Sequence, residues 1–194
     1  MRLRFRGEDE MKGFEIIVLC NGFIRRDGKV VLEAHSSSTL VRSKSHTIVV
    51  DTSSSEYRPR IVERLREVGI DPEEVEVVIN THNHLDHSAN NDLFPKARFI
   101  SGPLGKGQDP TKLFPGIQLI GTPGHTPESI SVFVEAEKRY AIVGDAIPTH
   151  SNFIKWVIPA AHYDPDLALR SMERIAAFAE IIVPGHDAPF HIDR

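Results

Sequence analysis

Residues Thr81 to His87 read THNHLDH and place three imidazoles and one carboxylate within a single short stretch. They follow the apolar run VEVVIN (75–80), which is typical of a strand buried on both faces of a sheet. Burying or crowding such groups costs free energy unless something satisfies them. A divalent metal ion does so, because neutral imidazole and carboxylate are its usual nitrogen and oxygen ligands. The heptad therefore predicts a metal site at the end of a buried strand.

The same arrangement, an apolar strand followed directly by His or Asp, recurs three times further along the chain. The segment IQLIGTPG precedes His125, YAIVG precedes Asp145, and EIIVPG precedes His186. Glycine stands immediately before each of the three and permits a sharp turn or a close backbone approach. One such residue alone is more typical of a loop or a cap. Because strand ends can direct side chains into a shared crevice, we expect the three to meet the heptad.

Apolar periodicity predicts an α/β protein in which each half has strands first and a helix later. A hairpin is expected around Asp27-Gly28, and helices at 57–68, ended by Gly69, and 165–179, begun by Asp164. Strands are expected at 14–20, 39–41, 46–52, 75–80, 97–100, 117–121, 130–136, 139–144 and 180–184, the first quarter forming one antiparallel sheet. These elements fit two mixed sheets covered by outer helices, in a single domain over residues 1–194.

Composition narrows the function classes. The formal net charge of −4 gives no global attraction toward nucleic acid or anionic membranes. No apolar run is long enough to span a bilayer, and the first residues, MRLRFRGEDEMKGF, lack the apolar core of a secretory signal, so a cytoplasmic protein is expected. The only cysteine, Cys20, lies in the apolar run FEIIVLC and is expected to be a small core residue.

Several further polar residues are expected to be structural. Ser36 to Ser38 are expected to form a polar turn, and His150 to border the crevice of Asp145. Surface or packing roles are expected for His35, His46, His162 and His191. Two arginine clusters are expected to be solvated, namely Arg2, Arg4 and Arg6, and Arg58, Arg60, Arg64 and Arg66.

Five motifs, in order along most of the chain, resemble those of the metallo-β-lactamase superfamily: HTIVVDTS (46–53), THNHLDH (81–87), TPGHTPESIS (122–131), YAIVGDAI (140–147) and IIVPGHDAPF (181–190). The resemblance implies an αββα sandwich with metals at one edge of the two sheets. Asp51 would orient ligands. Ser53 and Glu128 stand where the family commonly has glycine, so the turn at Ser53 is expected to differ. By position, the first metal would take His82, His84 and His125, the second Asp86, His87 and His186, and Asp145 would bridge them.

The resemblance also implies a mechanism. Two divalent ions, expected to be Zn²⁺ with Mn²⁺ or Fe²⁺ as alternatives, would share a water and lower its pKa toward neutrality. The bridging hydroxide, aimed by Asp86, would attack an ester, thioester or lactone carbonyl of a small-molecule substrate. Residues 148–163, which include Phe153 and Trp156, are expected to be either a lid over the metals or core beneath a loop.

Three alternatives stay open at this point. One is a phosphodiesterase or ribonuclease that acts on nucleic acid with the same ions, because a finer likeness to small metallo-β-lactamase domain-containing proteins includes some linked to RNA cleavage. Another is an iron-dependent oxidoreductase similar to the persulfide dioxygenases, which would hold one iron. The last is a non-catalytic binding relative, disfavoured because all seven ligand positions are filled. Substrate identity, native metal and oligomeric state do not follow from the sequence.

Overall fold

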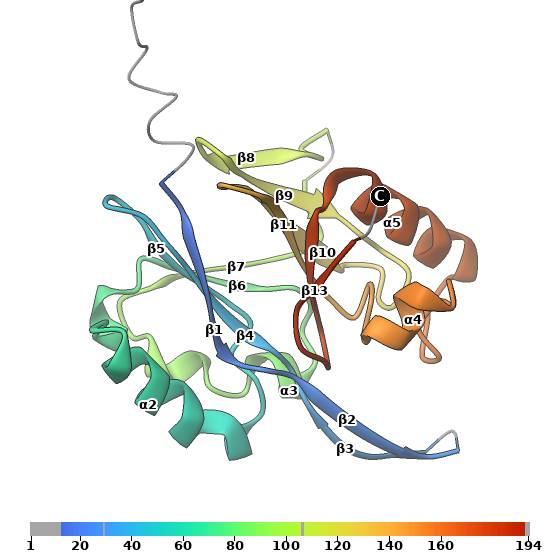
Figure 1. Ribbon diagram of the computed structural model, residues 1–194, viewed down its shortest axis with the longest axis horizontal. Helices are drawn as coiled ribbons and strands as arrows, with labels where there is room; N and C mark the ends of the chain where they lie inside the picture. The colour runs from blue at the N-terminus through green and yellow to red at the C-terminus, as the bar shows by residue number, and fades with distance from the viewer. Residues whose placement is uncertain (1–12, 29, 106, 193–194) are drawn as a thin grey trace, which may run out of the picture.

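The protein is described here by a computed structural model covering residues 13–28, 30–105 and 107–192. Its strands form two large mixed sheets that pack face to face (Figure 1). The first sheet has the order β1-β4-β5-β6-β7, and the second the order β13-β12-β11-β10-β9-β8. Pairing is parallel for β5–β6, β6–β7 and β11–β12, and antiparallel elsewhere in these sheets. The expected αββα arrangement is confirmed.

The strands of the first sheet are β1 (Glu15–Cys20), β4 (Ser38–Arg42), β5 (Thr47–Val50), β6 (Val77–Asn80) and β7 (Arg98–Ser101). Those of the second sheet are β8 (Thr111–Phe114), β9 (Ile117–Gly121), β10 (Ile130–Glu135), β11 (Arg139–Gly144), β12 (Ile181–Pro184) and β13 (Phe190–His191). The short edge strands β8 and β13 were not expected from the sequence.

Helix α2 (Arg58–Glu67) covers the outer face of the first sheet, and α5 (Pro165–Phe178) covers that of the second (Figure 1). Both predicted caps are confirmed: the Asp164 carboxylate accepts from the Leu167 N–H, and Gly69 has φ 71 just past α2. The shorter elements are α3 (Leu85–Ser88), α4 (His150–Ile154), and the single turns η1 (Ser55–Tyr57), η2 (Pro72–Glu74) and η3 (Asn91–Leu93). No helix in the described part of the chain has the length and apolarity to cross a membrane.

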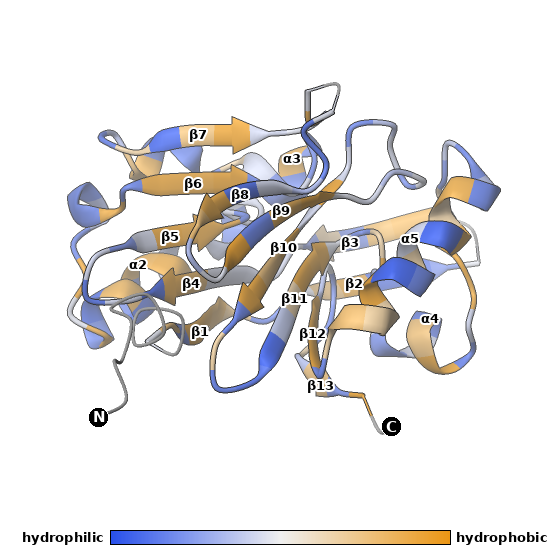
Figure 2. Cartoon of the chain, turned by 90° about the horizontal axis from the view of Figure 1, so that it is seen from above, coloured by the Kyte–Doolittle hydropathy of each residue, from blue (hydrophilic) through white to orange (hydrophobic). Residues whose placement is uncertain are grey.

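Alternation along each central strand builds three apolar layers. In β5, Ile48 and Val50 face the space between the sheets, while Val49 packs on the side of Ile61 and Leu65 of α2. The second sheet divides in the same way, with Val132 and Ile142 between the sheets and Phe133 and Val143 toward α5. Because both faces are buried, the central strands read as continuous apolar runs, and Figure 2 shows them almost wholly hydrophobic. This packing holds the strand ends in fixed positions.

The hairpin predicted around Asp27-Gly28 is confirmed as β2 (Phe23–Asp27) and β3 (Val30–His35), with Gly28 at φ 56. The expectation that it belongs to one first-quarter sheet is wrong. The two strands pair only with each other and project from the sandwich (Figure 1), because most of their side chains are exposed rather than packed on β1 or β4.

The polar turn predicted for Ser36 to Ser38 is wrong. All three are buried, because they run from β3 into β4 beneath the ends of β5 and β12 and bond to neighbouring carbonyls.

Candidate metal centre

The heptad changes direction at His84. After β6, residues 81–83 form a turn, and His84 then has an extended backbone (φ −66, ψ 145) as the N-cap of the single-turn helix α3. This change places His82 and His84 on the turn, and Asp86 and His87 on the helix. His82 and His87 are fully buried, whereas His84 is exposed. The heptad therefore presents two pairs of donors in two different directions.

The three residues beyond the heptad reach it as expected. His125 Nε2 lies 3.2 Å from His84 Nδ1 and 3.5 Å from Asp145 Oδ2. Asp145 Oδ1 lies 3.1 Å from His186 Nε2 and 3.4 Å from His87 Nε2. Side chains that are up to about a hundred positions apart in the chain thus meet at one edge of the two sheets.

Two groups of three donors flank Asp145, and in each group the donor atoms lie within 4.8 Å of one another. We call one group the open flank (His82, His84, His125) and the other the anchored flank (Asp86, His87, His186). In the open flank, His82 Nε2 and His84 Nδ1 are 3.0 Å apart. Ligand atoms at the Zn–N bond length of a tetrahedral site are about 3.3 Å apart, so this spacing fits one ion.

The glycine before each of His125, Asp145 and His186 is required because another part of the chain lies too close to leave room for a Cβ. A Cβ on Gly185 would lie 2.2 Å from Asp145 Oδ1, and one on Gly144 (φ 49) would lie 2.2 Å from Thr81 Oγ1. At Gly124 (φ 141) it would lie 2.3 Å from the backbone of Ala168 in α5. The role inferred from sequence for these glycines is confirmed.

Asp51, at the end of β5, orients the anchored flank. Its carboxylate accepts from the Thr81 N–H at 2.7 Å and the Thr81 hydroxyl at 2.8 Å, and lies 2.8 Å from His87 Nδ1. Its backbone has φ 55, and that of Ser53 has φ 58, a region that favours glycine. The Ser53 hydroxyl donates to the Ser36 carbonyl at 2.7 Å. The expectation that the turn at Ser53 differs from the family's stays a prediction.

Two backbone carbonyls hold the outlying histidines. His186 Nδ1 bonds to the His35 carbonyl at 3.0 Å, and His125 Nδ1 to the Ala161 carbonyl at 2.7 Å. Each contact leaves Nε2 of the same ring facing the centre, the arrangement found in metal-ligating histidines. Sequence reasoning missed both carbonyls, because every residue carries one and no side-chain pattern marks them.

The charges at the centre follow from burial and proximity. Burial, together with His87, lowers the pKa of His82, and burial with His125 lowers that of His84. Burial acts against ionisation of Asp145, yet His186 and His87 hold its pKa well below the usual range. Burial likewise opposes protonation of His87, but Asp51 and Asp145 raise its pKa to about 10. At neutral pH the carboxylate of Asp145 is ionised, and His82 and His84 are neutral, the form that binds metal, whereas His87 carries a proton that a bound metal would have to displace.

Buried polar atoms give a second indication that these residues can hold metal ions. Among the described residues, His87 Nε2 and Asp145 Oδ1 are buried and make no well-aligned hydrogen bond, although Asp145 Oδ1 lies within ion-pair distance of His186 Nε2 and His87 Nε2. Such atoms normally cost free energy and need an explanation. Both point into the space that the two flanks share, where a divalent ion would satisfy them. The donor set, five imidazoles and two carboxylates, suits Zn²⁺ and similar ions.

Other residues singled out from the sequence lie elsewhere. His150 is not part of the crevice, because its exposed ring stacks on Phe190 at 4.2 Å. Cys20 is buried, and burial raises the pKa of its thiol to about 11, as expected of a core residue. Trp156 is 42% exposed, so it is not core. The cluster of Arg2, Arg4 and Arg6 lies outside the described residues.

Comparison with known proteins agrees with this geometry. The family model of the metallo-beta-lactamase superfamily matches residues 32–111. A "probable metallo-hydrolase" of Methanocaldococcus jannaschii is 37% identical over 178 residues, 89% of this chain and 86% of its own length. The chain belongs to the metallo-β-lactamase superfamily. As a member, it is a metal-dependent hydrolase with His and Asp groups that can bind metal.

Two further relatives are informative. Metallo-beta-lactamase domain-containing protein 1 of Mus musculus is 30% identical, over 93% of this chain and 85% of its own length. The N-acyl homoserine lactonase AiiA of Bacillus thuringiensis subsp. kurstaki is 31% identical, over 66% of this chain and 62% of its own. A structure of a B. thuringiensis AiiA variant with N-decanoyl-L-homoserine at its active site has a TM-score of 0.69 at 23% identity, over 91% of this chain and 94% of that one. That likeness shows a shared fold.

Proposed function

We propose that this metallo-β-lactamase superfamily member is a dinuclear hydrolase that cleaves an ester, thioester or lactone of a small acyl compound. The observation that carries the proposal is the pair of donor groups flanking Asp145, whose buried Oδ1 makes no well-aligned hydrogen bond to any described residue. A single ion would engage one flank and leave the three converging donors of the other flank unused. Two ions would use both flanks.

In this proposal the open flank would hold one ion and the anchored flank the other, and Asp145 would be within reach of both. Two bound divalent ions would supply a water of lowered pKa and polarise the scissile carbonyl. Asp51 keeps His87 in one orientation, and the His35 carbonyl does the same for His186. The site is therefore organised before substrate arrives, which limits the reorganisation needed in the transition state.

Asp86 is the catalytic residue that we assign. Its side chain is 27% exposed, whereas that of Asp145 is 11% exposed, so it is the carboxylate that an incoming water meets first. Its Oδ2 lies 3.6 Å from His186 Nε2, and its backbone carbonyl accepts from the Ser36 N–H at 3.0 Å. Held at its backbone, Asp86 can accept a hydrogen bond from the attacking water and aim it at the carbonyl carbon.

The charge of the surface favours a small substrate over nucleic acid. In the arginine cluster near α2, Arg58 pairs with Asp92 at 2.7 Å and Arg64 with Glu67 at 2.8 Å. The Arg60 guanidinium lies over the Tyr57 ring. These cations are engaged locally, as expected of solvated surface groups, and the net charge is −4. The likeness to a homoserine lactonase adds support for an acyl substrate.

The test is a hydrolase panel on protein loaded with zinc or manganese, with thioesters, lactones, esters, phosphodiesters and RNA assayed side by side. His84→Ala and Asp145→Ala should each abolish hydrolysis and lower the metal content per chain. His46→Ala is the matched control, because its ring stacks on Phe114 at the opposite end of β5. Normal turnover by either site variant, one iron per chain, or turnover of RNA alone would refute the proposal.

A further inference from the structure

A groove of about 550 Å³ lies between the β2–β3 hairpin and the segment that contains α4. Apolar side chains form much of its wall, including Ile24 and Val31 from the hairpin and Pro148 and Ala161 from the opposite side. Its volume is in the range of small-ligand sites. In Figure 1 the hairpin and α4 lie on the same side of the molecule.

Backbone contacts join the walls of the groove to residues of the candidate metal centre. The Ala161 carbonyl bonds to the ring of His125, and the Pro148 carbonyl accepts from the His186 N–H at 2.7 Å. On the hairpin side, His35 at the end of β3 bonds through its carbonyl to the ring of His186. Both walls therefore begin at residues that touch the outlying histidines. A substrate whose carbonyl lies at the metals can extend its remaining part into this groove.

Arg26 gives the groove a charge. It lines the groove in β2, and within the described residues no ion pair or hydrogen bond engages its guanidinium. Its neighbour Arg25 differs, because Arg25 pairs with Glu33 at 3.2 Å. A β-bulge between Arg25 and Arg26 separates the two in the hairpin. An unpaired guanidinium beside an apolar wall suits a carboxylate at the end of a hydrocarbon chain.

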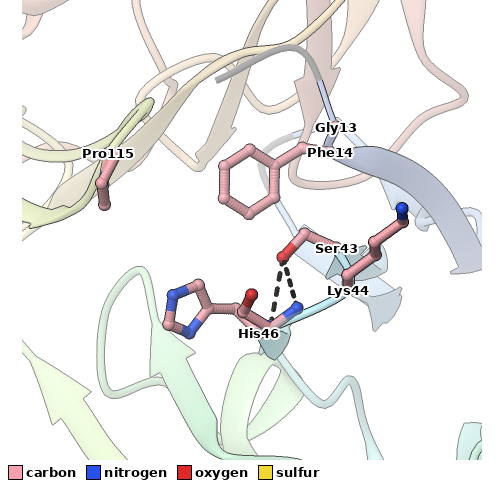
Figure 3. A pocket seen from close by; sticks show the side chains of 7 residues that line it. Gly13, Phe14, Ser43, Lys44, His46 and Pro115 are labelled. Atoms are coloured by element: carbon pink, nitrogen blue, oxygen red, sulfur yellow. Dashed lines mark hydrogen bonds between the residues drawn. The ribbon is translucent and has the colours of Figure 1, made fainter. Parts of the chain in front are cut away.

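A second hollow does not offer the same combination. It has a volume of about 300 Å³ and lies at the opposite end of β5, lined by Phe14, Lys44 and His46 among others (Figure 3). The Ser43 hydroxyl there accepts from the His46 N–H, and His46 pairs with Glu76. Ser43 and His46 are thus satisfied within the protein. Lys44 makes no ion pair among the described residues, but the hollow is remote from the metal centre.

We propose, on the basis of the function proposed above, that the groove binds the acyl chain of the substrate. Arg26 then pairs with a carboxylate at the end of that chain distant from the scissile bond. The substrate class is a lactone, ester or thioester of a dicarboxylic acid. Ile24 and Val31 contact the methylenes, and Arg26 discriminates this class from simple fatty acyl compounds of equal length.

The test uses the zinc-loaded protein and the leaving group that the hydrolase panel selects. Acetyl, octanoyl and mono-octanedioyl derivatives of that leaving group are compared for wild type, Arg26→Gln and the control Arg25→Gln. Arg26→Gln should raise KM for the octanedioyl derivative about tenfold, equivalent to about 1.4 kcal/mol, and leave the acetyl and octanoyl derivatives unchanged. Arg25→Gln should leave the KM values of all three derivatives unchanged.

Binding gives a readout independent of turnover. Calorimetry with octanedioate and octanoate should show that Arg26→Gln weakens only octanedioate, and Val31→Asp should weaken octanoate. If the acetyl derivative is hydrolysed but Arg26→Gln has no selective effect on the octanedioyl derivative, the groove assignment is overturned and the proposed hydrolase function stands. Failure of all carbonyl substrates would defeat both. A loss of RNA binding in Arg26→Gln, with no effect on octanedioate, would assign the groove to nucleic acid instead.

Discussion

The anchored flank and the open flank of the metal centre hold similar side chains by different means. On the anchored flank, the Asp51 carboxylate holds His87, and the root of the β2–β3 hairpin holds Asp86 and His186. On the open flank, His84 is exposed and His125 depends on a carbonyl of the segment after α4. The anchored flank is therefore held from within the sandwich, whereas in the open flank only His82 is fully buried and His125 depends on a surface segment.

This difference suggests that the anchored flank is rigid and that the open flank can adjust. A flank fixed by buried contacts keeps its geometry whether or not ligand is present, because moving it would leave buried polar groups unpaired. A flank that rests on a surface segment can adjust as substrate enters the groove beside it. The following substitutions test the comparison, from the largest expected effect to the smallest.

Asp51→Ala should have the largest effect. It leaves the Thr81 N–H and the His87 ring without their buried partner. We expect a loss of about 3 to 5 kcal/mol in the free energy of unfolding and a fall of about a hundredfold in activity. Denaturant unfolding and kcat/KM measure these losses. Asp92→Ala, which removes an exposed partner of Arg58, should change stability by under about 0.5 kcal/mol. Equal effects of the two changes would break the comparison.

Gly185→Ala should come next. The added Cβ would lie 2.2 Å from Asp145 Oδ1 and displace the carboxylate shared by both flanks. We expect a stability loss of about 1 to 3 kcal/mol and a roughly tenfold to hundredfold fall in kcat/KM, since small misplacements of reacting groups are costly. Gly69→Ala is the control, because nothing lies within 4 Å of its Cβ and only its positive φ is strained. It should lower stability without lowering activity.

Asn152→Ala sharpens the comparison on the open flank. Its side chain donates to the Val157 carbonyl at 3.0 Å and accepts from the Thr149 hydroxyl at 2.7 Å, which ties the segment leading to Ala161 onto α4. Loosening this segment should weaken zinc binding by up to about tenfold, measured by competition with a chelator. Ser151→Ala, next to it on the exposed side of α4, should leave affinity unchanged. A larger loss than that of Asp51→Ala would reverse the ranking of the two flanks.

Cys20→Ala should have the smallest effect on the site. The thiol is buried under α2 with a raised pKa, and neither flank uses it. Activity should stay within about twofold of wild type, and stability should fall by about 1 kcal/mol. In the native protein the thiol should react with a disulfide reagent only after unfolding, because the thiolate is the reactive form. Rapid modification with loss of activity would contradict this.

The sequence predicts the interior of this protein better than its rim. Central strands such as β6 are covered on both faces, so their apolar runs indicate their place directly. The convergence of His125, Asp145 and His186 on the heptad could be predicted because a strand end and a glycine mark each of them. By contrast, α3 has only one turn, and α4 is marked mainly by the Thr149 cap, which sequence reasoning overlooked.

The supports of the site were the least predictable part. The carbonyls of His35 and Ala161 act through the backbone, and the Asp51 contact with His87 depends on how two parallel strands end side by side. Such contacts arise from tertiary structure, so local propensity does not reveal them. The same reason explains why the groove beside Arg26 was not foreseen: its two walls are more than a hundred residues apart in the chain.

Anomalous diffraction from crystals of the zinc-loaded protein tests the dinuclear centre most directly. We expect two peaks about 3.5 to 4 Å apart, one contacted by the open flank and the other by the anchored flank, with Asp145 between them. A single peak, or two peaks away from His125 and His186, would contradict the dinuclear site.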